Sequence, residues 1–174
     1  MYKIGIMGHS PEYFSLPEDK IRDLLRETIG LLVYQYKDVI FNIDADIGAG
    51  LWAADECLHS GGVFDGPVYY HLFLPYPLEI TSEDWYDDQK ELLKNCCNHA
   101  HSITICEAGK PASISSVYQP GCEIVQDSNF TIFYWNGMKQ GHTFQAIKHA
   151  LESNKVAING LDDLKLITSQ HLHK

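Results

Sequence analysis

Short runs of β-branched and aromatic residues alternate along this chain with longer segments in which apolar residues recur at helical spacing. The short runs predict six strands, at residues 3–7, 39–43, 68–74, 102–106, 130–134 and 155–158. Parallel strands need crossover connections, and these are usually helices. The alternation therefore predicts an α/β fold with a mainly parallel sheet and helices packed on its faces.

The segments between the strands predict five helices. In the first segment Ile21, Leu24, Leu25 and Leu32 lie on one helical face, and residues 15–18 resemble a capping box, so this helix is expected to reach about Tyr36. Further helices are expected at residues 51–60, 83–100, 121–127 and 143–153. Residues 107–119 are small and polar, and indicate a loop. Residues 1–161 are interpreted as one ligand-binding domain, and residues 162–174 as a tail of unassigned structure.

Length and charge restrict the possible functions. A chain of 174 residues is long enough to bury a core without disulfides or a structural metal. It carries 13 Lys and Arg against 23 Asp and Glu, a net charge of −10, and Arg22 and Arg26 are its only arginines. Since affinity for duplex nucleic acid comes largely from neutralised phosphates, we expect no duplex nucleic-acid partner.

Cysteine use and hydropathy indicate a cytoplasmic protein. The five cysteines form an odd set without a CxxC spacing, which favours free thiols in a reducing compartment. The apolar run at the start is too short for a signal peptide, and no stretch approaches membrane-spanning length, so no membrane partner is expected. The cysteines and histidines of residues 96–101 point in different directions on a helix, so we predict no metal site, and no cofactor.

Small and polar residues follow four of the predicted strands. In open α/β sheets, ligands bind outside the carboxyl ends of the strands. The residues concerned are Gly8, His9 and Ser10 after the first strand, Asp46, Gly48 and Gly50 after the second, Tyr76 after the third, and Asn136, Gly137, Gly141, His142 and Thr143 after the fifth.

Two of these connections open helices with glycine. Gly48 and Gly50 would allow backbone amides to approach a ligand, and the first turn of a helix presents unpaired N–H groups to negative charge. Gly141 and Thr143 repeat this arrangement at the last predicted helix. The alternative is that the glycines only permit close packing of helix against sheet. The sequence leaves both interpretations open.

The order of several motifs is similar to that of a known family. The motifs are residues 46–55, Asp-Ile-Gly-Ala-Gly-Leu-Trp-Ala-Ala-Asp, residues 118–122, Tyr-Gln-Pro-Gly-Cys, and residues 141–143, Gly-His-Thr. On these motifs the chain resembles the SLOG superfamily, and within it the YpsA-like branch. The resemblance implies a Rossmann-like or flavodoxin-like doubly wound sheet in a single domain. It also implies a pocket for nucleotides or nucleotide-derived signals. Relatives include the DNA-uptake protein DprA and the lonely-guy phosphoribohydrolases.

The chain departs from the family pattern in two places. Between Gly121 and Asn129 it has no Lys or Arg, so a strongly phosphorylated ligand lacks its usual counter-charge. Thr143 is followed by Phe144 and Gln145, where lonely-guy enzymes carry a glutamate pair, and an amide cannot serve as a carboxylate base. We therefore expect binding of a nucleotide or nucleotide-derived small molecule without turnover. The alternative is a lonely-guy-like N-glycosidase or phosphoribohydrolase using one of the carboxylates Asp46, Asp55 or Glu56.

The predicted ligand site gathers the residues of the four connections and one residue from the family motif. A Ser or Cys hydrolase built on Ser10, Cys122 and His142 has no nucleophile elbow to support it, and a scaffold with a vestigial pocket remains a third class. The apolar character of residues 51–60, together with the resemblance, predicts a homodimer or higher homo-oligomer. The predicted ligand-binding residues are Gly8, His9, Ser10, Asp46, Gly48, Gly50, Tyr76, Tyr118, Asn136, Gly137, Gly141, His142 and Thr143.

Overall fold

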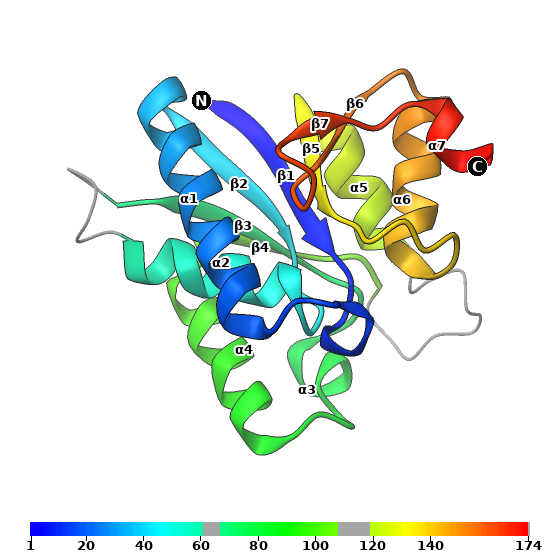
Figure 1. The fold of residues 1–174 in the computed structure, drawn as a ribbon. Coiled ribbons are helices and arrows are strands. Elements are labelled where there is room, and N and C mark those ends of the chain that lie inside the picture. Colours follow the sequence, from blue (N-terminus) through cyan, green and yellow to red (C-terminus); the bar gives the residue numbers. More distant parts are fainter. Residues whose placement is uncertain (61–66, 108–118, 174) are drawn as a thin grey trace.

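The computed structural model describes residues 1–60, 67–107 and 119–173, which form a helix-covered sheet (Figure 1). The sheet has seven strands in the order β4-β3-β2-β1-β5-β6-β7. Strands β1 to β6 are parallel, and β7 pairs antiparallel with β6. Their bounds are β1 Tyr2–Gly8, β2 Val39–Asp44, β3 Tyr69–Leu74, β4 Ser102–Ile105, β5 Phe130–Tyr134, β6 Val156–Asn159 and β7 Lys165–Leu166.

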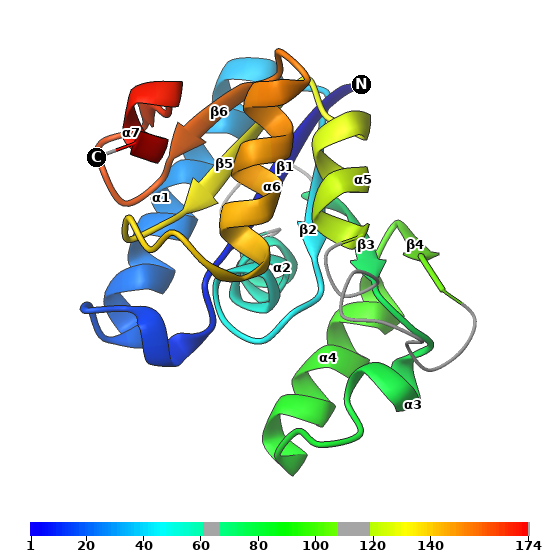
Figure 2. The same ribbon diagram turned by 90° about the vertical axis from the view of Figure 1, so that its right-hand side faces the viewer.

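Helices lie on both faces of the sheet, as the two ribbon views show (Figures 1 and 2). On one face are α1 (Glu18–Tyr36), α2 (Ala49–Ser60) and α4 (Asp87–His99), and on the other are α5 (Gln119–Asp127) and α6 (Gly141–Glu152). The short helices α3 (Leu78–Thr81) and α7 (Ser169–His173) and a 3-10 turn at Pro11–Tyr13 lie in the connections and the tail. This is the predicted doubly wound, Rossmann-like α/β fold.

Successive side chains of β1 face opposite sides of the sheet, where the core forms two layers. Ile4 and Ile6 face the larger cluster, which also contains Leu25 and Ile29 of α1. Met7 faces the smaller cluster, under α6. All six residues of β2 are buried, as expected for a central parallel strand covered on both faces.

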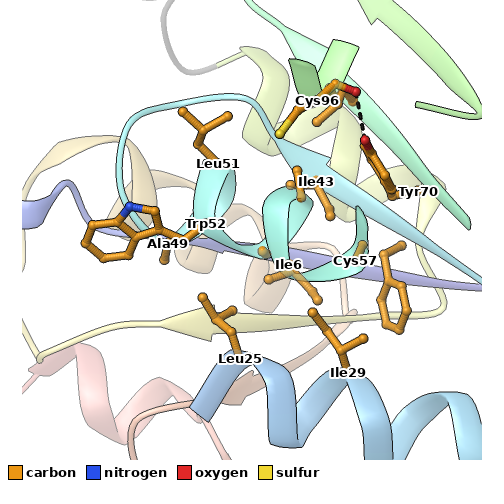
Figure 3. Close-up of a cluster of buried hydrophobic side chains, with 14 of the residues drawn as sticks. Ile6, Leu25, Ile29, Ile43, Ala49, Leu51, Trp52, Cys57, Tyr70 and Cys96 are labelled. Carbon is orange, nitrogen blue, oxygen red and sulfur yellow. Dashed lines mark hydrogen bonds between the residues drawn. The ribbon is translucent and has the colours of Figure 1, made fainter. Parts of the chain in front are cut away.

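Helix α2 lies deepest in the larger layer, where its apolar residues are already covered. It contacts α1, α4 and strands β1 to β3, and Figure 3 shows Leu51, Trp52 and Cys57 among the side chains of this cluster. Across the same layer the Tyr70 hydroxyl donates a hydrogen bond of 2.8 Å to the Cys96 carbonyl oxygen (Figure 3). The apolar surface of residues 51–60 is therefore used within the chain, which removes that argument for a homo-oligomer.

The predicted elements agree with the structure apart from their ends and the tail. The six predicted strands are confirmed, and β5 has its predicted bounds. The predicted capping box at residues 15–18 is wrong, because Pro17 is the N-cap of α1 and makes no side-chain capping bond. At α4 the Gln89 side chain accepts a 3.1 Å hydrogen bond from the Tyr86 amide, and this helix begins at Asp87 rather than at residue 83.

The tail, residues 162–174, whose structure the sequence left unassigned, contains regular elements. The tail contributes β7 and α7, and Ile167 and Leu172 pack against the cluster under α6. All five cysteines are free, as predicted. Within the described ranges, no helix is both long and apolar enough to cross a membrane.

Candidate functional site

The carboxyl ends of the parallel strands form the crest of the sheet, where the strand order reverses between β1 and β5. From β1 the chain proceeds through β2, β3 and β4 on one side, and β5, β6 and β7 lie on the other. A crevice at such a reversal is the usual ligand site of an open α/β sheet. The structure places His9, Asp46, Asn136 and His142 at this crest.

A pocket of about 330 Å³ lies between the ends of β2 and β3 and the start of α6. We call it the acidic pocket, because Asp44, Asp46, Glu83 and Asp84 line it and His142 is the one basic side chain in its lining. The aromatic side chains of Tyr76 and Trp85 line it as well.

Asp44, Asp46 and His142 form the charged centre of the acidic pocket. His142 Nε2 lies 3.4 Å from Asp46 Oδ2 and 3.7 Å from Asp44 Oδ2. Burial raises the pKa of the Asp44 carboxyl to about 7, with the charge of His142 opposing the rise and that of Asp46 adding to it. Near neutral pH this group therefore exists in both protonation states, and it can either donate or accept a hydrogen bond.

Asp44 is the site residue that the sequence analysis missed. It is the last residue of β2 and is only 5% exposed. A carboxylate at the end of a mostly apolar strand is a recognisable pattern, since acidic side chains are almost never fully buried unless they are paired.

The first turn of α6 is open and carries unused polar groups. No described atom lies within 4 Å of the position that a Cβ would occupy on Gly137 or Gly141. The N-cap residue Gln140 makes no side-chain capping bond. Thr143 is completely buried, and its Oγ1 has no hydrogen-bond partner in the described part of the chain.

His9 lies beside this turn with a similarly unused ring nitrogen. It is 3% exposed, and its Nε2 has no hydrogen-bond partner among the described residues. Burial lowers the pKa of His9, the charge of His142 lowers it further, and a hydrogen bond with Asn136 opposes both effects. The ring is therefore held as a neutral imidazole between Asn136 and His142.

The first turn of α2, in contrast, is filled by the chain itself. The Ala49 amide donates a 3.2 Å hydrogen bond to the His9 carbonyl oxygen. A Cβ on Gly48 would overlap that same oxygen, and a Cβ on Gly50 would overlap the Asp44 carbonyl oxygen. Both glycines are thus placed for close packing of backbone on backbone, the second of the two interpretations that the sequence left open.

The remaining predicted site residues are distributed around the crest. Gly8 packs tightly between Ala49 and Tyr134. Ser10 precedes the 3-10 turn as its N-cap. Asn136 and Gly137 line a second hollow, and Tyr76 lines the acidic pocket. Tyr118 lies outside the described residues.

Several side chains considered as catalytic or stacking groups have structural partners instead. Arg22 Nη1 lies 2.8 Å from Asp55 Oδ2 and 3.1 Å from Glu56 Oε1, and Arg26 Nε lies 2.9 Å from Glu56 Oε2. Both arginines thus link α1 to α2, and neither Asp55 nor Glu56 faces the acidic pocket. Trp52 is 6% exposed, with the Arg22 guanidinium 5.8 Å from its ring centroid, so it is a packing residue.

The described residues at the crest do not support a nucleophilic or a metal-dependent mechanism. Burial raises the pKa of the Cys122 thiol, and the nearby Glu123 adds to the rise, which disfavours a thiolate nucleophile. In the part of the chain that the structure describes, no group of three or more His, Cys, Asp or Glu side chains is arranged to hold a metal ion.

Comparison with known proteins identifies similar folds but no family. No family model matches the chain, and no curated protein matches it. Among solved structures, DNA processing protein A (DprA) from Streptococcus pneumoniae is 12% identical with a TM-score of 0.68 over 99% of this chain and 54% of that one. The chain thus spans about half of that protein. DNA processing protein A from Helicobacter pylori, whose structure concerns a unique single-stranded DNA binding mode, is 11% identical with a TM-score of 0.63 over 94% of this chain and 71% of that one.

These similarities establish a DprA-like fold and correct the predicted partner. We expected a nucleotide-like small molecule as partner and, on the basis of net charge, no duplex nucleic acid, yet a protein with this fold binds single-stranded DNA. The exclusion considered only phosphates along a duplex. Unpaired bases are also recognised by stacking and by hydrogen bonds to their edges, neither of which requires a basic protein. The prediction of a small-molecule partner with no nucleic acid is therefore wrong.

Proposed function

We propose that the acidic pocket binds an unpaired nucleobase of a single-stranded nucleic acid. The observation that carries the proposal is the pairing of buried Asp44 with Asp46 and His142 in a pocket that Tyr76 and Trp85 also line. Carboxylate oxygens accept hydrogen bonds from base amino groups, as in contacts to cytosine N4, and aromatic side chains provide surfaces on which bases stack.

The charge of the acidic pocket determines which part of a nucleotide can enter it. Four carboxylates line the pocket and repel phosphate, whereas a neutral base with N–H donors meets acceptors. A volume of about 330 Å³ is at the lower end of the range for ligand pockets, which suits one base and its sugar. The phosphates of the strand then remain outside the acidic pocket.

The fold and the sequence motifs support this assignment in different ways. The Helicobacter pylori protein of similar fold binds single-stranded DNA, and the resemblance to YpsA-like sequences favours a nucleotide-derived ligand at the crest. Binding without turnover is part of the proposal, because Gln145, where lonely-guy enzymes carry a glutamate, is an exposed residue of α6 and does not line the acidic pocket.

A second candidate function has one specific observation in its favour. An acid with a pKa of about 7 beside another carboxylate is the arrangement used to cleave glycosidic bonds. Here Asp44 would protonate the leaving base, and Asp46 would stabilise the cationic sugar. Chromatography of a strand incubated with the protein tests this function directly, since cleavage releases free base and leaves an abasic site.

The experiment for base binding is fluorescence anisotropy with labelled single strands of identical length. Strands of deoxyadenosine or deoxycytidine, which carry amino groups, should bind more tightly than deoxythymidine or abasic strands. Asp46→Asn should reduce this preference by about tenfold, because it removes an ionised acceptor. Asp19→Asn, an equal charge change on the exposed side of α1, is the matched control. Equal binding of adenosine and abasic strands would overturn the proposal.

A further inference from the structure

The largest hollow of the crest has no role in the proposed base site. It measures about 640 Å³ and is lined by residues that include Phe14, Leu16, Trp135, Asn136, Lys139 and His171. We call it the crest groove. Its lining residues include segments that follow β1, β5 and β6 in the chain.

The crest groove differs in charge from the acidic pocket. Lys139 is exposed and has no ion pair among the described residues, and His171 is a second basic side chain in the lining. Among the described residues, the carboxylate that lines the groove is that of Asp162, which forms an ion pair of 2.7 Å with Lys165. An anion that the carboxylates of the acidic pocket repel can therefore contact Lys139 in the crest groove, where Asp162 is already paired with Lys165.

The conformation of the loop before α6 leaves Lys139 accessible. Gly137 and Gly141 flank it with φ angles of +92° and +83°, and both have open space where a side chain would be. Trp135 Nε1 donates a 2.7 Å hydrogen bond to the Met138 carbonyl oxygen, and the Met138 amide donates one of 2.9 Å to Asn136 Oδ1. The residues before Lys139 are therefore anchored, while its side chain is not.

His9 lies close to residues of both hollows. Its ring centroid is 6.2 Å from that of Phe14, which lines the crest groove, and its imidazole interacts electrostatically with His142, which lines the acidic pocket. Since β1 and β5 are adjacent strands, the ends of these elements are neighbours on the crest. A chain molecule with a base in one hollow can therefore continue into the other.

We propose that the crest groove is a second subsite, which holds the phosphodiester and sugar adjoining the bound base, with Lys139 as the phosphate contact. This inference rests on the proposed function of the acidic pocket. It makes a dinucleotide, rather than a nucleoside, the smallest ligand that uses the whole crest. Apolar Phe14 and Leu16 give the sugar a non-polar surface, and Lys139 supplies the charge that the acidic pocket lacks.

Competition against a labelled deoxyadenosine strand tests the subsite. The competitors are deoxyadenosine alone and deoxyadenosine joined through one phosphodiester, on its 3′ or its 5′ side, to an abasic sugar. One of the joined compounds should compete at least about fivefold better than the nucleoside, the gain expected from one lysine–phosphate contact. Lys139→Ala should abolish this gain while leaving competition by the nucleoside unchanged.

Lys94→Ala is the matched control, because Lys94 is an exposed lysine on α4 and lines neither hollow. For the full strand, Lys139→Ala should also lower the slope of log affinity against log salt by about 0.7, as expected for one single-strand phosphate contact, and Lys94→Ala should not. Equal competition by nucleoside and joined compounds, or equal effects of the two substitutions, would overturn the subsite and leave the base site standing. A lack of preference for base over abasic strands would overturn the base site, and the subsite with it.

Discussion

Helices α2 and α6 both begin near glycines that follow a parallel strand, but the space beside these glycines is occupied at α2 and empty at α6. At α2 the positions beside Gly48 and Gly50 are occupied by the carbonyl oxygens of His9 and Asp44. At α6 no described atom lies within 4 Å of a Cβ on Gly137 or Gly141. A glycine near the start of a helix can thus permit close backbone packing, as at Gly48, or a positive φ angle in an open turn, as at Gly141.

The loop after β1 causes the difference. It folds over the start of α2, where the His9 carbonyl accepts a hydrogen bond from the Ala49 amide, and satisfies a helix end with protein backbone. Nothing equivalent covers α6 in the described structure, and the Thr143 hydroxyl and His9 Nε2 remain without partners there. Buried polar groups without partners are costly to folding, so their presence at one turn and not the other points to function at α6.

Substituting alanine for the first glycine of each turn should give the largest contrast. Gly48→Ala places a methyl group on the His9 carbonyl oxygen and strains a backbone with φ of +110°. We expect it to lower the free energy of unfolding by about 4 kcal/mol, the sum of overpacking and backbone strain. Gly141→Ala has comparable strain, at φ of +83°, without an overlap, and should cost only about 1 kcal/mol. Urea denaturation of both variants measures the difference.

This contrast also bears on the predicted ligand site. If Gly48 served a ligand instead of the chain, Gly48→Ala would fold nearly as well as Gly141→Ala and lose only binding. Equal unfolding free energies for the two variants would therefore contradict the structural distinction between the turns.

The elements of the fold could be predicted because their patterns are strong. The mostly apolar strand β2 is buried along its whole length and the helical stripe of α1 buries one face, so sequence and packing agree. The ends were less predictable. The N-cap of α4 is Tyr86, an aromatic residue that makes no side-chain capping bond, and β7 has only two residues, Lys165 and Leu166, with no apolar pattern.

The site could be predicted only in part, because its chemistry depends on contacts between distant segments. The sequence identified Asp46 and His142, but not their proximity to Asp44 or the rise in its pKa, since burial causes both. It also could not reveal that Arg22 and Arg26 are engaged by α2 carboxylates and unavailable to a phosphate. Net charge was uninformative for the same reason, because it averages over the acidic pocket and the crest groove, whose lining residues differ in charge.

Substitution of Asp44, the carboxylate 3.7 Å from His142 in the first turn of α6, should have a smaller and pH-dependent effect on stability. The pKa of Asp44 is raised from an ordinary value of 3.8 to about 7, so the folded protein binds more protons than the unfolded chain between these values. Its stabilising contribution is complete below the lower value and is lost as the pH rises through the higher one. Asp44→Asn removes the ionisation and should stabilise the protein by about 2 kcal/mol at pH 8, after allowance for the lost attraction to His142.

Melting temperatures across the pH range check this expectation. At pH 8 the Asn variant should melt about 4–8 °C above the wild type for a chain of this size, and the difference should shrink as the pH falls through 7 toward 4. A constant difference across this range would mean that Asp44 does not titrate near neutrality. Asp46→Asn, at a more exposed carboxylate of the same pocket, separates this effect from a general reduction of negative charge.

The unpartnered hydroxyl at the start of α6 should give the smallest effect on stability and a clear effect on binding. Thr143→Val exchanges a buried hydroxyl without a partner for a methyl group of similar size, so stability should rise by up to about 1 kcal/mol. Thr28→Val is its matched control, because the Thr28 hydroxyl, also buried, accepts a 3.1 Å hydrogen bond from Tyr134, and its loss should lower stability by about 1 kcal/mol. If the open turn of α6 is a binding element, Thr143→Val should weaken strand binding in the anisotropy assay while Thr28→Val leaves it unchanged. A more stable Thr143→Val protein with wild-type binding would show that the hydroxyl is a packing defect, and the contrast between the two turns would then concern folding alone.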